Sequence, residues 1–400
     1  MEKMILGTRF LALGLIIIAS GCIGIPESPN ENKYETLNKT TIIVCSSGCN
    51  FNSIQDAIDA AEVGDIVEVS SGTYYENVEV NKKILLSGRD TGNGFPIIDA
   101  WGHGSAITLT ENGIVLEQIH IKNSSENYMH PGAGISVYSN GNIIRFNRID
   151  GGQSGIYLSN ANNNRIQENE AKNSKYGVDL YNSNDNIISK NVISNNLWNG
   201  VEIFMASENN IIENNEITLN GYGPIYINGS GIQLENSGKK NIINGNILRY
   251  NRKSGIDLAD SSENIIGNNE IGYNGFFGIH IGTTIASNHG SGHNVISNNI
   301  INNNANGIYI EKEGYENNGN IICNNKLENN TIYNAFDGSG SNQWNKDKVG
   351  NYYSDFDEPD EGCTDLDENG LCDISMPPHT IPGAGNIDRY PLSLWRKSDI

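Results

Sequence analysis

The sequence predicts an all-β fold, a parallel β-helix in which the chain winds into a solenoid of stacked coils. Two observations support this prediction. Short apolar segments that begin with glycine, such as "GVDL", recur at intervals of 21 to 31 residues, and asparagines recur in step with them. A unit of this length, with β-branched runs separated by Asn, Ser and Gly, is too short and too strictly alternating for a helical repeat.

The repeat has eight units with a fixed internal spacing. The leading glycines are Gly134, Gly155, Gly177, Gly200, Gly231, Gly255, Gly278 and Gly307. An asparagine follows in each unit, at Asn142, Asn164, Asn186, Asn210, Asn241, Asn264, Asn294 and Asn320, and a further asparagine stands five residues after each of these. Coils stacked about 4.8 Å apart place like residues in ladders, with apolar side chains inside and Asn at the bends. Ile144, Ile166, Ile188 and Ile212 are therefore expected on consecutive coils.

The first residues indicate export. Lys3 and Arg9 flank the start of an apolar region that leads to "ASGC", which ends at Cys22. This layout predicts a signal peptide over residues 1–21 and a lipidated Cys22 that anchors the protein to a membrane. Residues 22–40 are predicted to be a flexible tether, and residues 41–343 the β-helix with a cap at its start.

A short amphipathic helix is predicted at the start of the β-helix, in "SIQDAIDAA", with Ser53 or Asn52 as its N-cap. A helix placed over the first coil would prevent pairing at that edge. Outside the cytoplasm, two close cysteine pairs are expected to form disulfides, Cys45 with Cys49 and Cys363 with Cys372. Zinc is the alternative for these pairs, but no His stands at zinc-finger spacing from either.

The segments "GTYYENVEVNKKILLSG", "GNYYSDF" and "DRYPL", together with the Asn/Ile repeat, identify a family likeness. The chain resembles the NosD-like branch of the right-handed parallel β-helix proteins, in the pectin-lyase-like superfamily, with Tyr353 where that branch usually has Trp. The resemblance implies a periplasmic or surface protein, a link to copper, and substrates bound on a strand face. Residues 344–400 would then form a C-terminal Asp-rich cap.

One outward column of residues contains the candidates for chemistry. In a Gly-Ile-x-Leu strand, position x points away from the core. Stacking of the units gives the column Ser136, Tyr157, Asp179, Glu202, Gln233, Asp257, His280 and Tyr309. Residues two positions later form a second column that includes Tyr181, Phe204, Glu235 and Glu311. The sequence therefore predicts one face on which acids, amides and aromatic rings lie together, exposed to solvent.

Three interpretations of this face remain open. It is a passive solvated surface; or a glycan-binding groove in which Tyr157, Tyr181, Trp198 and Phe204 stack on sugar rings while Gln233, Glu235 and the acids bind hydroxyls; or a catalytic groove. The catalytic candidates are Asp179, Glu202 and Asp257, because carboxylates on neighbouring coils meet the roughly 5 to 9.5 Å separations of glycosidases. Any acids on neighbouring coils would do so. A lyase would also need a base, for which Arg249 and Arg252 are the nearest cations.

Two metal sites are predicted. In "DLDENGLCD", Asp365, Asp367, Asn369, the Leu371 carbonyl and Asp373 match the first nine places of a calcium loop, although Met376 replaces the glutamate expected at the twelfth. A disordered acidic loop is the alternative. His280, His289 and His293 are candidate copper ligands, with ordinary exposed loop histidines as the alternative.

The bulk properties exclude one partner class and favour another. A formal net charge of −21 argues against binding to nucleic acid. We therefore expect a monomeric, exported, membrane-anchored lipoprotein that binds an extended polysaccharide or cell-surface glycan without catalysis. A polysaccharide hydrolase or lyase is the first alternative, and an accessory protein in copper delivery the second. Four Asn-x-Ser/Thr sequons, at Asn38, Asn123, Asn228 and Asn329, can arise by chance in so Asn-rich a chain.

Overall fold

The structure is a computed structural model that describes residues 39–126, 132–223, 229–236, 239–284, 290–312, 317–373 and 378–395. The predicted signal peptide (1–21), Cys22 and the tether up to residue 38 lie outside the described residues, and so do His289 and Met376. No helix in the described part of the chain has the length and apolar character that a bilayer crossing requires.

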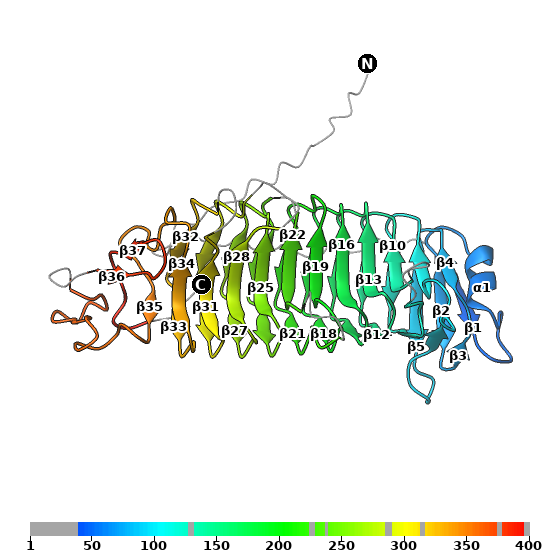
Figure 1. The fold of residues 1–400 in the computed structure, drawn as a ribbon. Helices are drawn as coiled ribbons and strands as arrows, with labels where there is room; N and C mark the ends of the chain where they lie inside the picture. Colours follow the sequence, from blue (N-terminus) through cyan, green and yellow to red (C-terminus); the bar gives the residue numbers. More distant parts are fainter. Residues whose placement is uncertain are drawn as a thin grey trace, which may run out of the picture.

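Three long parallel sheets wind around one axis, as predicted (Figure 1). Each interior coil contributes one strand to each sheet, and every pairing within the three sheets joins strands of successive coils. Sheet A comprises β1 (Thr41–Val44), β2 (Ile66–Ser70), β5 (Leu85–Arg89), β8 (Val115–Glu117), β11 (Ile143–Arg145), β14 (Arg165–Gln167), β17 (Ile187–Ser189), β20 (Ile211–Glu213), β23 (Ile242–Asn244), β26 (Ile265–Gly267), β29 (Val295–Ser297) and β32 (Ile321–Cys323).

Sheets B and C complete each coil. Sheet B comprises β3 (Thr73–Tyr74), β6 (Ile97–Asp99), β9 (His120–Lys122), β12 (Arg148–Asp150), β15 (Glu170–Lys172), β18 (Val192–Ser194), β21 (Glu216–Thr218), β24 (Ile247–Arg249), β27 (Glu270–Gly272), β30 (Ile300–Asn302), β33 (Lys326–Glu328) and β35 (Tyr352–Tyr353). Sheet C comprises β4 (Val78–Val80), β7 (Ile107–Leu109), β10 (Ala133–Val137), β13 (Ser154–Ser159), β16 (Tyr176–Tyr181), β19 (Val201–Phe204), β22 (Ile232–Glu235), β25 (Ser254–Ala259), β28 (Phe277–Gly282), β31 (Asn306–Ile310) and β34 (Tyr333–Asp337).

The core is a set of aliphatic ladders inside the coils. Ile144 pairs with Ile166, Ile166 with Ile188, and Ile188 with Ile212, and all four are fully buried, which confirms the predicted register. The repeated glycine allows sheets B and C to pack closely. A Cβ atom at Gly177 would lie 2.3 Å from Cγ2 of Ile193, so no larger residue fits there.

The asparagine columns are hydrogen-bonded ladders that provide partners for the backbone N–H and carbonyl groups at the bends. Asn215, for example, donates from Nδ2 to the Ile188 carbonyl at 2.8 Å and to Oδ1 of Asn246 at 3.0 Å. Both predicted columns behave in this way. A third ladder, not predicted, begins at Asn196 and runs through Asn220, Asn251, Asn274, Asn304 and Asn330 to Asn334.

Each ladder ends on a carboxylate near the C-terminal end of the solenoid. The last amides of the three ladders, on Asn342, Asn351 and Asn334, donate to Asp337, Asp388 and Asp355 respectively. Each ladder asparagine donates a side-chain N–H hydrogen bond to the next asparagine. The last asparagine of a ladder therefore needs another hydrogen-bond acceptor, and a carboxylate oxygen provides it. Asp388 belongs to the "DRYPL" motif, which therefore terminates one ladder.

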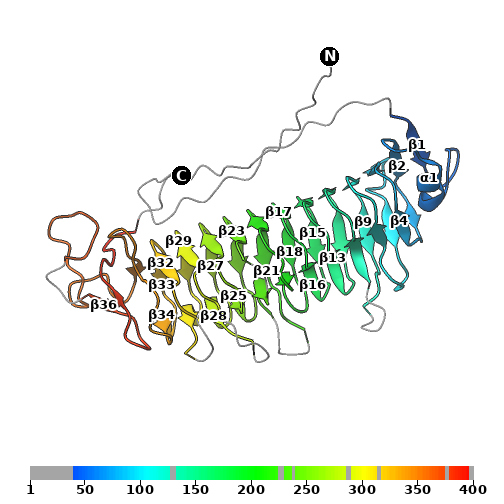
Figure 2. The ribbon, with the colours of Figure 1, turned by 90° about the horizontal axis from the view of Figure 1, so that it is seen from above.

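The two ends of the solenoid differ (Figures 1 and 2). At one end, α1 (Ile54–Ala60) packs against β1, β2 and β4, and the hydroxyl of Ser53 caps it, as predicted. At the other end lies the antiparallel pair β36 (His379–Thr380) and β37 (Ile387–Asp388). Both predicted disulfides are present, Cys45–Cys49 and Cys363–Cys372. Because β35 belongs to sheet B, the solenoid extends past residue 343, where its end was predicted.

Candidate functional site

The predicted outward column exists and lies on sheet C. Direct neighbours on successive coils are Ser136 and Tyr157, Tyr157 and Asp179, Asp179 and Glu202, Glu202 and Gln233, Gln233 and Asp257, Asp257 and His280, and His280 and Tyr309. The register of every pair agrees with the alignment of the repeat units in the sequence. The structure therefore brings together all the candidates of this column on one face.

The expected exposure of the column is wrong for its central members. Glu202, Gln233, Asp257 and His280 retain only 7%, 5%, 1% and 8% of their accessible surface, and Asp179 is partly buried. A side chain that points away from the core is still enclosed when the coils on both sides carry long side chains at the same position. These four residues form a buried polar row.

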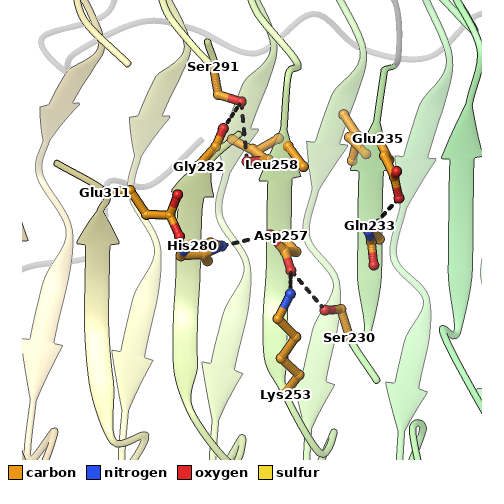
Figure 3. A network of polar contacts seen from close by, with 12 residues as sticks. Ser230, Gln233, Glu235, Lys253, Asp257, Leu258, His280, Gly282, Ser291 and Glu311 are labelled. Atoms are coloured by element: carbon orange, nitrogen blue, oxygen red, sulfur yellow. Dashed lines mark hydrogen bonds and ion pairs between the residues drawn. The ribbon is translucent and has the colours of Figure 1, made fainter. Parts of the chain in front are cut away.

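The row is charged at one end (Figure 3). Asp257 receives a hydrogen bond from Nζ of Lys253 at 2.5 Å, and its other oxygen lies 2.8 Å from Nδ1 of His280. Nε2 of His280 lies 3.2 Å from Oε1 of Glu311 on the next coil. The ionised groups therefore alternate in sign along three coils, which favours charge in a buried place.

The charged groups shift each other's titration. Burial alone would raise the pKa of Asp257, but the charges and hydrogen bonds of His280 and Lys253 hold it well below its usual range. Burial would lower the pKa of His280, and the carboxylates of Asp257 and Glu311 outweigh it and raise the pKa to about 9. Asp257 is therefore a carboxylate and His280 an imidazolium at neutral pH.

The acids at the other end of the row have raised pKa values. Burial raises the pKa of Glu202 well above its ordinary value, and the charges of Asp179, Glu235 and Asp257 add to the effect. Burial also raises the pKa of Asp179 to about 7, against the hydrogen bond that it accepts from Ser154. The amide of Asn199 bridges Glu202 and Gln233, at 2.5 and 2.9 Å. One face thus carries an acid with a raised pKa, Glu202, and an acid with a lowered pKa, Asp257, two coils apart.

The aromatic candidates lie at the surface beside this row. We call Tyr138, Tyr157, Tyr181 and Phe204 the aromatic strip. Tyr138 and Tyr181 are 51% and 38% exposed, while Tyr157 and Phe204 are partly buried. The rings of Tyr181 and Phe204 are 6.0 Å apart, and those of Tyr138 and Tyr157 are 6.4 Å apart. Glu235 follows Phe204 on the next coil and accepts from Gln233 at 3.0 Å.

Trp198 is not part of the strip. It lies just before β19 and packs edge-on against Tyr176, with ring centres 5.1 Å apart, while Nζ of Lys175 lies 5.7 Å from its ring centre. Trp198 precedes the strand, so its place at the bend between sheets B and C follows from the coil geometry. Its predicted role in sugar stacking therefore has no support from its position.

The arginines proposed as a lyase base have partners other than Asp257. Arg249 is on β24 in sheet B and pairs with Glu270 on the neighbouring coil, and Arg252 donates to the Gly223 carbonyl at 3.3 Å. The cation on Asp257 is Lys253, which the sequence argument missed. Lys253 stands four residues before Asp257, at the bend that leads into β25, and that spacing was the available signal.

The structure describes two of the three predicted copper ligands, His280 and His293, so copper binding stays a prediction. His280 uses both ring nitrogens on carboxylates, and an imidazolium has no lone pair for a metal. His293 is exposed, and His289 lies outside the described residues. Among the residues that are described, no three His, Cys, Asp or Glu side chains form a metal-binding cluster.

The Asp-rich loop is folded on its own backbone. Asp365 accepts N–H bonds from Asn369 and Gly370 at 3.0 and 2.9 Å, and Asp373 accepts one from Leu366 at 2.9 Å. Leu371 N donates to Oδ1 of Asn369 at 2.8 Å, and Asp367 is exposed. The carboxylates are thus engaged by the loop itself, and calcium at this loop stays a prediction.

Comparisons with known proteins agree with this geometry. Residues 97–237 match the family described as "Right handed beta helix region", and residues 224–358 match "Periplasmic copper-binding protein (NosD)". Over these two overlapping segments the chain is similar to NosD-like β-helix proteins. This NosD-like chain is also 33% identical, over 234 residues, to a cell surface glycoprotein of Methanothermus fervidus. The alignment covers 56% of the chain and spans about a third (32%) of the relative's length.

Solved structures share the fold of this NosD-like protein. The mannuronan C-5 epimerase A-module of Azotobacter vinelandii has a TM-score of 0.52 at 14% identity, with 73% of this chain and 93% of that chain covered. An α-1,3-glucanase catalytic domain in complex with tetrasaccharides has a TM-score of 0.50 at 16% identity, with 82% and 71% covered. At these identities the likeness shows the architecture alone.

Proposed function

We propose that this protein is an exported β-helix protein that binds an extended polysaccharide along the sheet C face without turning it over. Its export is supported by the "ASGC" segment and by the names of its relatives, one periplasmic and one a cell surface glycoprotein. An anchor at a lipidated Cys22 completes the proposal.

The observation that carries the proposal is the aromatic strip beside the polar row. The strip spans four successive coils about 4.8 Å apart, with Tyr181 and Phe204 in the second outward column and Tyr157 in the first, so its rings share one face of a rigid scaffold. Exposed rings that are held in place by neighbours bind with little loss of side-chain entropy. Glu235 and Glu311, at the edge of the buried row, offer carboxylate oxygens to sugar hydroxyls.

Burial argues for binding over turnover. A general acid must reach the glycosidic oxygen in the transition state. Glu202 and Asp257 are only 7% and 1% exposed, and their oxygens are engaged by Asn199, Lys253 and His280. The buried row thus positions the surface residues, while the aromatic strip and the exposed acids contact the ligand.

The test is a glycan array, followed by titration of the strongest ligand. Tyr181→Ala and Phe204→Ala are each expected to raise Kd by about 2- to 12-fold, as the loss of one stacked ring weakens binding by about 0.5–1.5 kcal/mol. Tyr273→Ala is the matched control, because Tyr273 is 48% exposed at a bend outside sheet C. Equal loss in all three variants, or no bound glycan, would overturn the proposal.

A polysaccharide-acting enzyme is the second candidate, and one observation favours it. Burial raises the pKa of Glu202, while His280 and Lys253 lower the pKa of Asp257 two coils away against the effect of burial, a split typical of acid and base partners. Product analysis on any bound glycan separates the two functions. Cleaved or epimerised product that disappears in Glu202→Gln would replace binding by catalysis.

Copper delivery rests on the name of the matched family, "Periplasmic copper-binding protein (NosD)". Equilibrium dialysis against Cu(I) and Cu(II) tests it directly. Retention of one copper per chain, lost when His289 and His293 are both replaced by Ala, would support delivery of the metal. We expect no such retention, because His280 is occupied by Asp257 and Glu311.

A further inference from the structure

The structure separates two sequons that look equivalent in the sequence. In exported proteins, the asparagine of Asn-x-Ser/Thr is an acceptor for N-linked glycans. Of the four sequons, those at Asn38 and Asn228 lie outside the described residues. The other two begin at Asn123 and Asn329. Each of these asparagines occupies the bend after a sheet B strand, with φ values of 57° and 55°.

The sequon at Asn123 is closed. Nδ2 of Asn123 donates to Oδ2 of Asp99 at 2.8 Å. Ser124 and Ser125 are only 4% and 3% exposed, and the backbone N–H of Ser125 is bonded to the Gly104 carbonyl at 2.9 Å. An enzyme that must reach both the amide and the hydroxyl of the sequon finds the hydroxyl inside the protein.

The sequon at Asn329 is open. Asn329 and Thr331 are both exposed, and the backbone of Asn329 is fixed by a hydrogen bond from its N–H to Oγ of Ser354 at 3.0 Å. Within the part of the chain that the structure describes, the side-chain amide of Asn329 has no hydrogen-bond partner. The amide nitrogen and the hydroxyl are therefore both available at a rigid, solvent-facing bend.

We propose that Asn329 carries an N-linked glycan. The donor is a lipid-linked oligosaccharide phosphate or pyrophosphate. The bond between the anomeric carbon and the phosphate oxygen breaks, a bond from that carbon to Nδ2 of Asn329 forms, and Nδ2 releases one proton to the transferase. The lipid phosphate or, from the pyrophosphate donor, the lipid pyrophosphate leaves, and no oxidant or reductant is required.

The position gives the glycan a physical role. Ile332 and Tyr333, next to the sequon, are 61% and 37% exposed, although both are apolar enough to favour burial. Tyr333 begins β34, which is the last strand of sheet C. An edge strand is a template for pairing with another chain unless something covers it. The C-terminal segment already pairs with the Asp337 end of β34, so a glycan on Asn329 would shield the other end, at Tyr333, and these side chains.

Peptide mapping of the protein isolated from the cells that make it tests the proposal. Trypsin releases the two sequons separately, as residues 123–145 and 327–346, because Lys122, Arg145, Lys326 and Lys346 bound them. We expect peptide 327–346 to carry an added oligosaccharide mass, with sugar fragment ions on collision, and peptide 123–145 to be bare. An unmodified 327–346 peptide would overturn the proposal.

Matched variants locate the attachment. Asn329→Gln and Thr331→Val each remove the sequon and should abolish the added mass, whereas Thr331→Ser keeps the sequon and should retain it. Asn330→Ala changes the middle residue and is expected to be modified as the wild type is. Added mass that persists on peptide 327–346 of Asn329→Gln would show attachment at another residue and contradict the assignment.

Discussion

At the scale of single residues, the sheet C face shows that direction and exposure are separate properties in a β-helix. Asp257 points away from the core and is nevertheless almost completely enclosed, since residues of the coils above and below occupy the same column. A buried carboxylate is tolerated only with partners, and Lys253 and His280 provide them. The contacts with Asp257 and Glu311 that favour a charged His280 therefore exist only in the folded protein.

Stability should decrease at high pH because of His280. Its folded pKa of about 9 exceeds the unfolded value near 6.5, so its contribution is complete below pH 6.5 and is lost as pH rises through about 9. We expect the difference in free energy of unfolding between wild type and His280→Gln to shrink between pH 7.5 and 10, by up to about 1.4 kcal/mol per pH unit.

Urea unfolding at intervals across this window measures the difference. The window lies above the range in which Asp179 and Asp388 titrate, since burial raises the pKa of each to about 7. The exposed His293 provides the control variant His293→Gln, for which no such trend is expected. A wild-type advantage over His280→Gln that stays constant with pH would show that the charge of His280 does not stabilise the fold.

At the scale of elements, the ladders and their ends hold the coils in register. Each interior asparagine is both donor and acceptor, so its ladder continues until it meets a group that accepts without donating. Asp337 has this role for the first ladder and is completely buried. It also accepts from Trp344 Nε1 at 2.9 Å and from the side chain of Asn386. One carboxylate thus joins sheet C, the ladder and the C-terminal segment.

Asp337→Asn should loosen the C-terminal end of the solenoid. The new amide would direct N–H groups at donors, and each buried polar group left unsatisfied costs about 1–3 kcal/mol. We expect faster hydrogen exchange in β34 and β31 and little change in β10 and β13, because coils contact only their neighbours. Asp347→Asn, at an exposed position in the same region, is the control. Uniform exchange changes along the whole solenoid would contradict this local role.

Much of the element order followed from the sequence, and the limits have physical causes. The glycine and asparagine spacings were sufficient to predict the register of the strands. The backbone needs a residue without a side chain at the glycine position and a hydrogen-bonding side chain at the asparagine position, and both needs recur from coil to coil. The third asparagine ladder also had a signal, a further step of five residues from Asn191 to Asn196 and so on. The pairing of Lys253 had a local signal, its position four residues before Asp257. The burial of Glu202 had none, since it depends on the side chains of neighbouring coils.

At the scale of the whole molecule, the protein is a single stack with two different ends (Figure 2). In such a stack, stability comes from contacts between neighbouring coils. The coil at each end has a neighbour on one side only, so other parts of the chain must cover its free side. At the C-terminal end the closure includes the Cys363–Cys372 disulfide, which brackets the Asp-rich loop. The loop is joined to the rest of this end by the hydrogen bond from Ser393 to Asp365, at 2.6 Å.

Calcium should strengthen this end if the loop is a site. The negative charge gathered in Asp365, Asp367 and Asp373 is uncompensated by any ion pair among the described residues. A cation that binds only the folded protein stabilises it by about 2.7 kcal/mol at 100 times its Kd. We expect chelation to lower the Tm, added millimolar Ca²⁺ to restore it, and Asp367→Ala to lower the Tm and remove the response. Asp347→Ala should keep the response. A wild-type Tm that is the same with chelator and with calcium would show that the loop is held by its own backbone hydrogen bonds alone.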